Sequence, residues 1–405
     1  MSDAPKAPIP DATVALGSLP VTVLMVDDQA MVGEAVRRMM ADQPDIKFHF
    51  CSDPTKAMQM AREIQPTVIL QDLVMPEVDG LQLVKFFRAN ASTRDVPMIV
   101  LSSREEPETK YKAFQLGAND YMVKLPDKLE VVARIRYHSR AYITLRERNA
   151  AFDALHASQE ALKGELNEAE RYMRSLFPAP MEDDILKADW YYLSCTSLGG
   201  DSFGYHWIDP DHFVVYVLDV CGHGVGAALL SVSAMNVLRA QSLPSVDFKD
   251  PASVLAGLND AFDMEKQNDM YFTIWYGVYQ RSTGKLSYAA GGHPPAVLLP
   301  ASARQSPRLL HASNAIIGAM PGLPFKAEIT TLAPGDSLYV FSDGVYEVNY
   351  ANRPGMMTVE EFAAELSKPS TIGVRKLEEM VAFVRREQGQ ENFEDDFSMV
   401  EIILK

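Results

Sequence analysis

Five polar side chains stand at the ends of short apolar segments in the first third of the sequence. Asp27 and Asp28 follow VTVLMV, Asp72 ends TVILQ, Ser102 follows PMIVL and Lys124 follows YMV. Adjacent carboxylates repel one another unless a cation joins them, so Mg²⁺ is the natural occupant of such a site. Asp72 is then a possible nucleophile toward phosphorus, with Lys124 offsetting charge and Ser102 donating to the transferred group. Singly, each residue could be a helix cap, a turn hydroxyl or a solvated end.

A second set of acids lies beside apolar segments later in the chain. Several carboxylates with no His-x-His pattern and no paired cysteines favour Mg²⁺ or Mn²⁺ over zinc. Two such ions about 4 Å apart could activate a water to attack a phosphate in line. Each acid alone could equally be a turn residue with a local backbone hydrogen bond. The set comprises Asp201 in LGGDSFG, Asp219 in HFVVYVLDV, Asp343 in LYVFSDG, and Asp395 with Asp396 in FEDDFSMVEI.

Strand and helix patterns alternate from 21 to 138, where the first set of residues lies. Five strands alternating with five helices imply a doubly wound α/β domain, with a five-stranded parallel sheet covered on both faces. Ligands bind outside the carboxyl ends of such strands, so the five polar side chains should converge. The predicted strands are 21–26, 47–51, 67–72, 97–103 and 120–124, with helices at 31–40, 54–64, 81–89, 108–116 and a last one beyond 127.

A long helix is predicted between Asp127 and Leu176, because this stretch has no proline and only one glycine, Gly164. Apolar or neutral residues recur at alternating spacings of three and four, interrupted at Arg148, which is typical of a coiled-coil seam. We therefore predict a coiled-coil linker over 139–180 and a homodimer formed through it; an amphipathic helix packed on its own domain is the alternative. The seam positions are Ala141, Leu145, Phe152, Leu155, Gln159, Leu162, Leu166, Ala169, Met173 and Leu176.

Residues 185–405 are β-rich with several helices, which predicts an α+β layered domain, a β-sandwich flanked by helices. Strands are expected at 191–198, 212–220, 271–280, 285–292, 296–300, 328–332, 336–344 and 397–404, and helices at 225–240, 251–265, 358–366 and 370–387.

Composition restricts the class of protein. A chain of 405 residues with 47% hydrophobic residues can bury more than one core, and a net charge of −16 argues against nucleic-acid binding. Three separated cysteines indicate reduced thiols, which suits the cytoplasm. Residues 1–20 are rich in proline and predict a flexible leader, and neither a signal peptide nor a membrane-spanning segment is expected.

The first segment resembles the receiver domain of bacterial two-component response regulators, through MVDDQ, ILQDLVMPEVDG, IVLSS and GANDYMVK. The resemblance implies phosphorylation of Asp72 by a cognate histidine kinase and a switch in which Ser102 and Tyr121 move together. The family usually has a proline directly after the lysine, often with a cis bond, whereas Leu125 stands here before Pro126. The implied Mg²⁺ ligands are Asp27, Asp28 and Asp72.

Residues 185–405 resemble the metal-dependent serine/threonine protein phosphatases of the PPM superfamily, in particular the bacterial RsbU and SpoIIE branch. The motifs GGDSFG, LDVCGHGVGAAL, YAAGGHPPAVLL, LAPGDSLYVFSDGVYE and EDDFSMVEI follow the family's order. The resemblance implies two Mn²⁺ or Mg²⁺ ions and a supporting role for Asp396. Many relatives carry a second acid three residues after the first, where this chain has Gly204. The implied ligands are Asp201, Asp219, Asp343 and Asp395, with a backbone carbonyl near Val220.

Two histidines are candidates for further roles in the second domain. His223 could donate a proton to the leaving serine oxygen or could stabilise its turn, and His293 is expected to brace a loop behind the site.

The two resemblances together predict a response regulator whose phosphorylation at Asp72 controls a metal-dependent serine/threonine phosphatase. The implied substrate is a phosphorylated anti-sigma-factor antagonist in a partner-switching pathway. The rival is a non-catalytic adaptor, as in RssB, that binds a sigma factor or anti-sigma partner through a phosphatase-like domain. Such an adaptor would not need the metal carboxylates, which this chain retains.

Overall fold

A computed structural model describes the chain in two compact units, one ending at Ser158 and the other running from Gln159 to Lys405. The expected leader and the Leu125–Pro126 step fall outside the described residues. These are 20–405 apart from 77, 104–105, 125–126, 196–197, 303–305 and 371.

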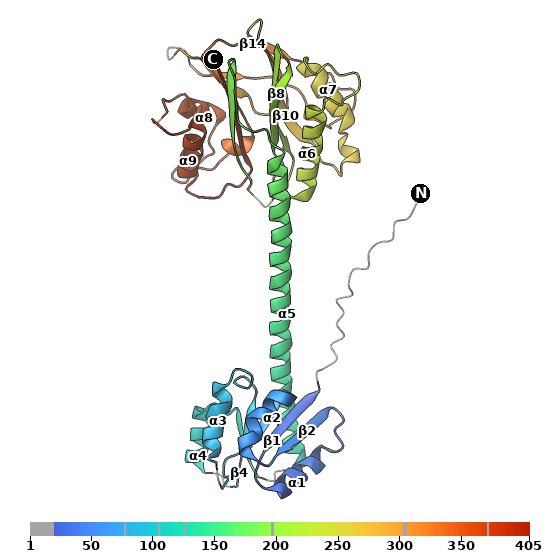
Figure 1. Cartoon of the computed structure of the whole chain (residues 1–405), viewed down its shortest axis with the longest axis vertical. Helices are drawn as coiled ribbons and strands as arrows, with labels where there is room; N and C mark the ends of the chain where they lie inside the picture. Colours follow the sequence, from blue (N-terminus) through green and yellow to red (C-terminus); the bar gives the residue numbers. More distant parts are fainter. Residues whose placement is uncertain are drawn as a thin grey trace, which may run out of the picture. The chain divides into compact units, whose positions relative to one another are not determined.

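The first unit holds a five-stranded parallel sheet, as predicted, and its strand order is β2-β1-β3-β4-β5. Strands β1, β2 and β4 of this sheet are labelled in Figure 1. The three middle strands β1, β3 and β4 are mostly apolar and almost fully buried because helices cover both faces, whereas the edge strands β2 and β5 are more polar and more exposed. The strands are β1 (Val21–Val26), β2 (Ile46–Cys51), β3 (Val68–Asp72), β4 (Met98–Ser102) and β5 (Asp120–Val123).

Two separate apolar clusters show which helices cover which face of this sheet. Val36 and Ile135 belong to the cluster of helices α1 and α5, whereas Ala61, Phe87 and Ala113 belong to the cluster of α2, α3 and α4. The doubly wound arrangement is therefore confirmed. The helices are α1 (Ala30–Met40), η1 (Pro54–Lys56), α2 (Ala57–Ile64), α3 (Gly80–Ala89), α4 (Pro107–Gln115) and α5 (Lys128–Ser175).

Helix α5 is one uninterrupted helix of 48 residues, so the last receiver helix and the predicted linker are continuous. Its first turns are buried against the parallel sheet, with Val131 and Ile135 fully enclosed. Farther along, three seam positions are open to solvent in the single chain: Phe152 is 67% exposed, Leu155 58% and Leu162 56%.

The second unit is built on two antiparallel sheets, as expected for a β-sandwich. A five-stranded sheet has the order β14-β11-β10-β9-β8, and a six-stranded sheet has the order β13-β12-β15-β16-β7-β6. The strands are β6 (Met181–Glu182), β7 (Leu186–Leu193), β8 (Ser202–Asp209), β9 (His212–Val220), β10 (Phe272–Gln280), β11 (Lys285–Gly291), β12 (Ala296–Leu299), β13 (Arg308–Leu310), β14 (Glu328–Thr331), β15 (Ser337–Phe341) and β16 (Phe397–Leu404).

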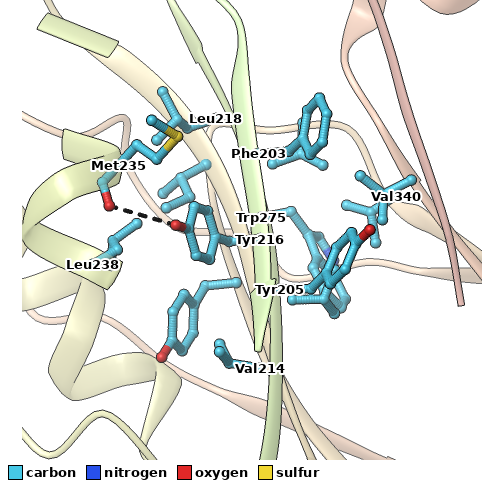
Figure 2. Packing of buried hydrophobic residues seen from close by; sticks show 14 of the residues in the cluster. Phe203, Tyr205, Val214, Tyr216, Leu218, Met235, Leu238, Trp275 and Val340 are labelled. Atoms are coloured by element: carbon cyan, nitrogen blue, oxygen red, sulfur yellow. Dashed lines mark hydrogen bonds between the residues drawn. The ribbon is translucent and has the colours of Figure 1, made fainter. Parts of the chain in front are cut away.

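Helices cover the outer faces of this sandwich. Figure 2 shows Tyr216 and Leu218 pointing toward Met235 and Leu238 of α6, while Trp275 points to the opposite side of the sheet. Helices α6 and α7 lie on the five-stranded sheet, and α8 and α9 belong to the cluster of the six-stranded sheet. Their bounds are α6 (Val225–Arg239), α7 (Pro251–Ala261), η2 (Met264–Lys266), η3 (Asp343–Val345), α8 (Val359–Leu366) and α9 (Lys376–Gln388).

Several predicted boundaries in the second unit were wrong. The strand expected over 191–198 begins earlier and ends at Leu193, and the helix expected from 370 begins at Lys376. Strand β8 was not predicted, although Phe203, Tyr205 and Trp207 alternate with the period of a strand. Within the described residues, no helix combines the length and apolar character needed to cross a membrane.

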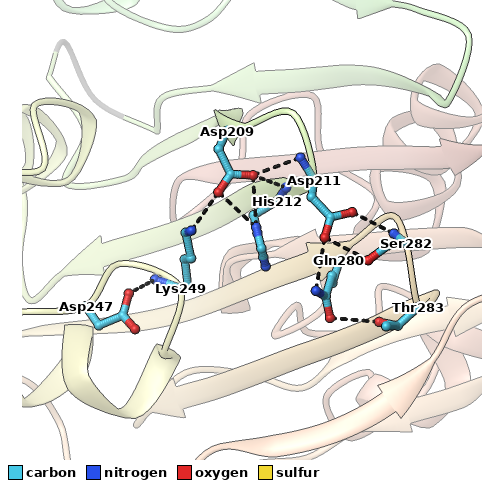
Figure 3. Close-up of polar contacts among 8 residues, drawn as sticks. All are labelled: Asp209, Asp211, His212, Asp247, Lys249, Gln280, Ser282 and Thr283. Carbon is cyan, nitrogen blue, oxygen red and sulfur yellow. Dashed lines mark hydrogen bonds and ion pairs between the residues drawn. The ribbon is translucent and has the colours of Figure 1, made fainter.

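A polar network fixes the register of the β8–β9 hairpin (Figure 3). Asp209 accepts hydrogen bonds from the backbone of Asp211 and His212, and it forms an ion pair with Lys249 at 2.7 Å. Hydrogen bonds from Lys249 and then His212 lower the pKa of Asp209. Asp211 also accepts a hydrogen bond from Gln280 at the end of β10. The network thus secures three adjacent strands at the end of β9 opposite Asp219.

Candidate functional site

The polar residues of the first unit converge at the carboxyl edge of its sheet, as the topology requires. The Lys124 ammonium lies 2.8 Å from an oxygen of Asp72 and 3.1 Å from an oxygen of Asp27. Both carboxylates are fully buried. Asp28 lies beside them, and ligand atoms of Asp27, Asp28 and Asp72 all fall within 4.8 Å of one another. These acids can therefore share one cation.

A backbone hydrogen bond and the Lys124 ammonium hold the Asp72 carboxylate in place. Asp72 Oδ1 accepts a hydrogen bond from Val74 N at 3.2 Å, and its other oxygen faces Lys124. Burial raises the pKa of Asp72 in spite of the hydrogen bond from Lys124. Ser102 and Tyr121 are both buried, Ser102 at the end of β4 and Tyr121 in β5. The edge thus combines buried carboxylates, an ammonium group and a hydroxyl.

Two glycines let the segment before β8 approach its neighbours in the second unit. A Cβ on Gly199 would collide with the Asp396 carboxylate, and one on Gly200 would stand 2.7 Å from the carbonyl oxygen of Val220. Asp201 follows directly. It is 1% exposed, and neither of its oxygens has a hydrogen-bond partner within the described residues. Burial, followed by the charges of Asp219 and Asp396, raises its pKa well above the ordinary value.

Asp219 and Asp343 reach the same region from other strands. Asp219 is next to last in β9, and Asp343 follows β15 at the start of η3. Burial, then the charges of Asp343 and Asp395, raises the pKa of Asp219 to about 8. Burial, followed by the negative charges of Asp395 and Glu347, raises the pKa of Asp343 to about 6. The acids predicted from four separate motifs therefore lie close enough to repel one another.

The last two acids enter just before β16. Asp396 is buried, and its Oδ1 accepts hydrogen bonds from Cys195 N at 2.9 Å and Ser194 Oγ at 3.2 Å. Asp395 is exposed, and its Oδ1 accepts from the backbone of Asp396. A Cβ on Gly344 would collide with the carbonyl oxygen of Asp396, so the Asp343 turn and the Asp395 turn are in direct contact.

This second cluster is more open than the receiver site. In the first unit, ligand atoms of three acids lie within 4.8 Å of one another. The described residues of the second unit contain no group of three acids that is this compact. A pair of cations 3.5–4 Å apart takes its ligands from a wider region than a single cation does. Oxygen donors alone, with buried unpaired carboxylates among them, fit hard divalent cations such as Mg²⁺ or Mn²⁺.

The two histidines occupy different environments. His223 is exposed in the turn before α6, and no hydrogen bond or ion pair joins it to the acids within the described ranges. His293 is 8% exposed, and its Nδ1 lies 2.7 Å from the hydroxyl of Thr273, which pairs with Asp219 across β9 and β10. Burial lowers the pKa of His293 to about 3, so this side chain is neutral at physiological pH.

Packing against Tyr216 explains why a glycine, and not a larger residue, stands at position 204. It pairs with Tyr216 across β8 and β9, and a Cβ there would collide with the Tyr216 phenol. Tyr216 is 1% exposed and points toward α6, as Figure 2 shows. An acid at position 204 would therefore have to displace a large aromatic residue of the core.

Some residues around the acids carried no signal in the sequence. Ser194 and Ser342 contact Asp396, and Thr273 lies opposite Asp219, because strands far apart in the chain pair here. Tyr192, next to Asp396, was missed for the same reason, since β7 pairs with β16.

Comparison with known proteins agrees with this division. Residues 23–136 match the family described as response regulator receiver domain, and residues 209–404 match the family described as Stage II sporulation protein E (SpoIIE). The chain thus joins a domain of the response regulator receiver family to a domain of the SpoIIE family. The second match covers Asp219, Asp343, Asp395 and Asp396, whereas Asp201 precedes it.

Individual relatives cover parts of the chain. The phosphoserine phosphatase RsbP of Bacillus subtilis (strain 168) is 29% identical over 189 residues, which are 46% of this chain and 46% of RsbP. The response regulator Rre1 of Synechocystis sp. is 25% identical over 44% of this chain and 78% of its own length. The chain thus spans less than half the length of RsbP.

A solved structure with the same fold is the SiaA-PP2C domain of Pseudomonas aeruginosa. It is 20% identical, has a TM-score of 0.53, and covers 62% of this chain and 99% of its own. This comparison supports the fold of the phosphatase domain.

The buried neutral His293 predicts a pH effect on the stability of the phosphatase domain. The unfolded histidine binds a proton near its ordinary pKa of 6.5, whereas the folded one does so only near 3, so its contribution to stability is lost as pH falls below 6.5. We expect a loss of about 2 kcal/mol from this residue between about pH 7.5 and 5.

Urea unfolding without divalent cations, followed by tryptophan fluorescence, would measure this effect. The chain has three tryptophans, Trp190, Trp207 and Trp275, and all lie in the second unit. The difference in unfolding free energy between the unsubstituted protein and His293→Asn should shrink by about 2 kcal/mol over this pH range. A constant difference would contradict the assignment.

Proposed function

We propose that the second unit is a metal-dependent protein phosphatase that removes phosphate from serine or threonine. The observation that carries the proposal is Asp201, whose two buried oxygens have no hydrogen-bond partner among the described residues and lie near the charges of Asp219 and Asp396. Unpaired buried carboxylates are costly unless cations neutralise them. The match to the SpoIIE family and the name of RsbP, a phosphoserine phosphatase, support this reaction class.

Four carboxylates would hold a pair of Mn²⁺ or Mg²⁺ ions, with the Val220 carbonyl completing the set. When bound, the two cations supply a water nucleophile at neutral pH and offset the charge of the phosphate. Asp396 orients the Asp201 backbone, since Asp201 N lies 3.4 Å from Asp396 Oδ2. His223 is free to approach a bound phosphoprotein from the exposed turn and to protonate the leaving oxygen. The four ligands are Asp201, Asp219, Asp343 and Asp395.

The substrate we propose is a phosphorylated anti-sigma-factor antagonist. The support is the likeness of the second unit to the RsbU and SpoIIE branch, and the pairing with a receiver suits a partner-switching pathway.

Removal of a ligand should abolish the reaction. We expect Asp219→Asn and Asp343→Asn to reduce Mn²⁺-dependent hydrolysis of an aryl phosphate at least about 100-fold, because each amide weakens cation binding and lowers the negative charge of the site. Asp260→Asn is the matched control, since Asp260 lies on α7 and accepts a hydrogen bond from Gly322. Steady-state rates over a Mn²⁺ titration provide the measurement.

Two outcomes would contradict the hydrolase proposal. One is hydrolysis that survives both substitutions. The other is a folded protein with no hydrolysis of aryl phosphates or phosphoproteins at saturating Mn²⁺, which would instead favour the non-catalytic adaptor.

We propose that the receiver is phosphorylated on Asp72 by a cognate histidine kinase and thereby changes the phosphatase rate. Lys124 would offset charge on the phosphoryl group, and Ser102 and Tyr121 would respond to it together. The ion pairs from Lys124 to both buried acids support this arrangement. Asp27, Asp28 and Asp72 would hold the Mg²⁺.

The receiver proposal predicts a specific chemical modification. Acetyl phosphate with Mg²⁺ should phosphorylate the protein on Asp72, and Asp72→Asn should remain unmodified in intact-protein mass spectra. The phosphatase rate should change with acetyl phosphate in the unsubstituted protein and stay constant in Asp72→Asn. Asp53→Asn is the control, since Asp53 caps η1 and is not part of the carboxylate cluster. An equal change in both proteins would show that the receiver does not control the rate.

We also propose that two copies pair through α5. The exposed seam residues Phe152, Leu155 and Leu162 would bury one another in a parallel coiled coil, which removes apolar surface from water.

Charges in the seam should break this pairing. We expect the unsubstituted chain to sediment as a dimer and Leu155→Glu/Leu162→Glu to sediment as a monomer. Ala161→Glu places one charge off the seam on the same exposed stretch and should leave the dimer intact. A monomeric unsubstituted chain at micromolar concentration would contradict the proposal.

A further inference from the structure

Tyr192 carries a buried hydroxyl beside the acids of the phosphatase domain. It lies in β7 opposite Ser398 of β16 and is 0% exposed. Gly199 lies beside this hydroxyl and the Asp396 carboxylate. A Cβ atom placed on Gly199 would stand 2.6 Å from the Tyr192 hydroxyl oxygen and would collide with Asp396 Oδ2. The hydroxyl and the carboxylate oxygen therefore lie on the same side of Gly199, close to each other.

Asp396 Oδ2 can still accept a short hydrogen bond. Asp396 Oδ1 already accepts from Ser194 and Cys195, whereas Oδ2 receives a long contact of 3.4 Å from Asp201 N. The Tyr192 hydroxyl makes no hydrogen bond of good geometry within the described residues, although Ser194, which donates to Asp396 Oδ1, lies near enough to lower its pKa against the effect of burial. An unpaired buried hydroxyl costs about 1–3 kcal/mol, so its position next to a carboxylate calls for an explanation.

The last turn of α5 holds the ring of this tyrosine. Arg174 Nη2 donates a hydrogen bond to the Tyr192 carbonyl at 3.3 Å, and the guanidinium carbon lies 5.8 Å from the ring centroid. Just beyond α5, the Phe177 ring packs edge-on against the Tyr192 ring with centroids 5.0 Å apart. Met173 is buried in the same cluster. The position of the phenol therefore depends on where α5 ends.

We propose that Tyr192 is a positioning residue that links the last turn of α5 to Asp396 and, through Asp396, to Asp201. A small rotation or shift of this turn would move the phenol relative to Oδ2 and change the support of both acids. The inference rests on the proposed function, because it requires that these acids hold divalent cations. It adds a specific route by which a change in α5 reaches the metal ligands.

The test compares two tyrosine variants of the full chain. Mn²⁺ binding is measured as the rise in the unfolding temperature of the second unit, followed by tryptophan fluorescence, to which the receiver does not contribute. We expect Tyr192→Phe to need about tenfold more Mn²⁺ for the same rise, because such supporting residues typically change metal affinity 10–100-fold. The unfolding temperature without cation should not fall. Tyr205→Phe is the control, since its hydroxyl donates to Ala179 O at 2.9 Å within the same core.

The outcomes separate the inference from the proposed function. If the unsubstituted chain is stabilised by Mn²⁺ and Tyr192→Phe responds at the same concentrations, the positioning role is overturned while the metal site stands. If Mn²⁺ does not stabilise the unsubstituted chain, the proposed function is overturned together with this inference.

The link to α5 has its own test. Arg174→Met removes the hydrogen bond to the Tyr192 carbonyl and the charge beside the ring. We expect Arg174→Met alone to raise the required Mn²⁺ concentration severalfold, and to have no further effect when combined with Tyr192→Phe, since both changes act through one side chain. Additive effects in the double variant would overturn the coupling through Tyr192.

Discussion

Electrostatic repulsion among buried carboxylates is the constraint on which the phosphatase domain depends. Asp201, Asp219 and Asp343 all have raised pKa values because burial and their neighbours disfavour the charged form. The fold forces these groups together in spite of that cost. The two-sheet core opposes this cost, with Phe272, Trp275 and Tyr276 of the neighbouring strand β10 almost fully buried. In the receiver the same conflict is partly relieved by Lys124, which contacts two of the acids.

Backbone packing, more than side-chain contacts, brings the acids together. Gly199, Gly200 and Gly344 stand where a Cβ would meet Asp396 or the Val220 carbonyl. Because these glycines have no side chains, three turns from different strands can lie in contact. The polar network at Asp209 joins β8, β9 and β10 near the start of β9. Asp219 lies at the other end of the same strand.

The receiver was predictable because its information is local. Strands β1, β3, β4 and β5 each lead into a polar residue of the site, and parallel topology then dictates where Asp27, Asp72 and Lys124 meet. The acids of the second domain could also be named from their motifs. Strand β8 was missed although Phe203, Tyr205 and Trp207 alternate with the period of a strand, whereas the end of β7 at Leu193 depends on its pairing with β16, which no local pattern shows. The contacts of Tyr192 and Thr273 depend on pairing between distant strands, which no local pattern encodes.

The position of β16 has a consequence for synthesis of the protein. This strand lies between β15 and β7, and the turn before it places Asp396 against Cys195, 201 residues earlier. While the ribosome is still making the intervening chain, β7 has an unpaired edge next to apolar side chains, and such edges expose nascent chains to aggregation. The receiver strands pair over short separations and can form first. A nascent chain in this interval would carry a folded receiver and an incomplete sandwich, which is a state that chaperones bind.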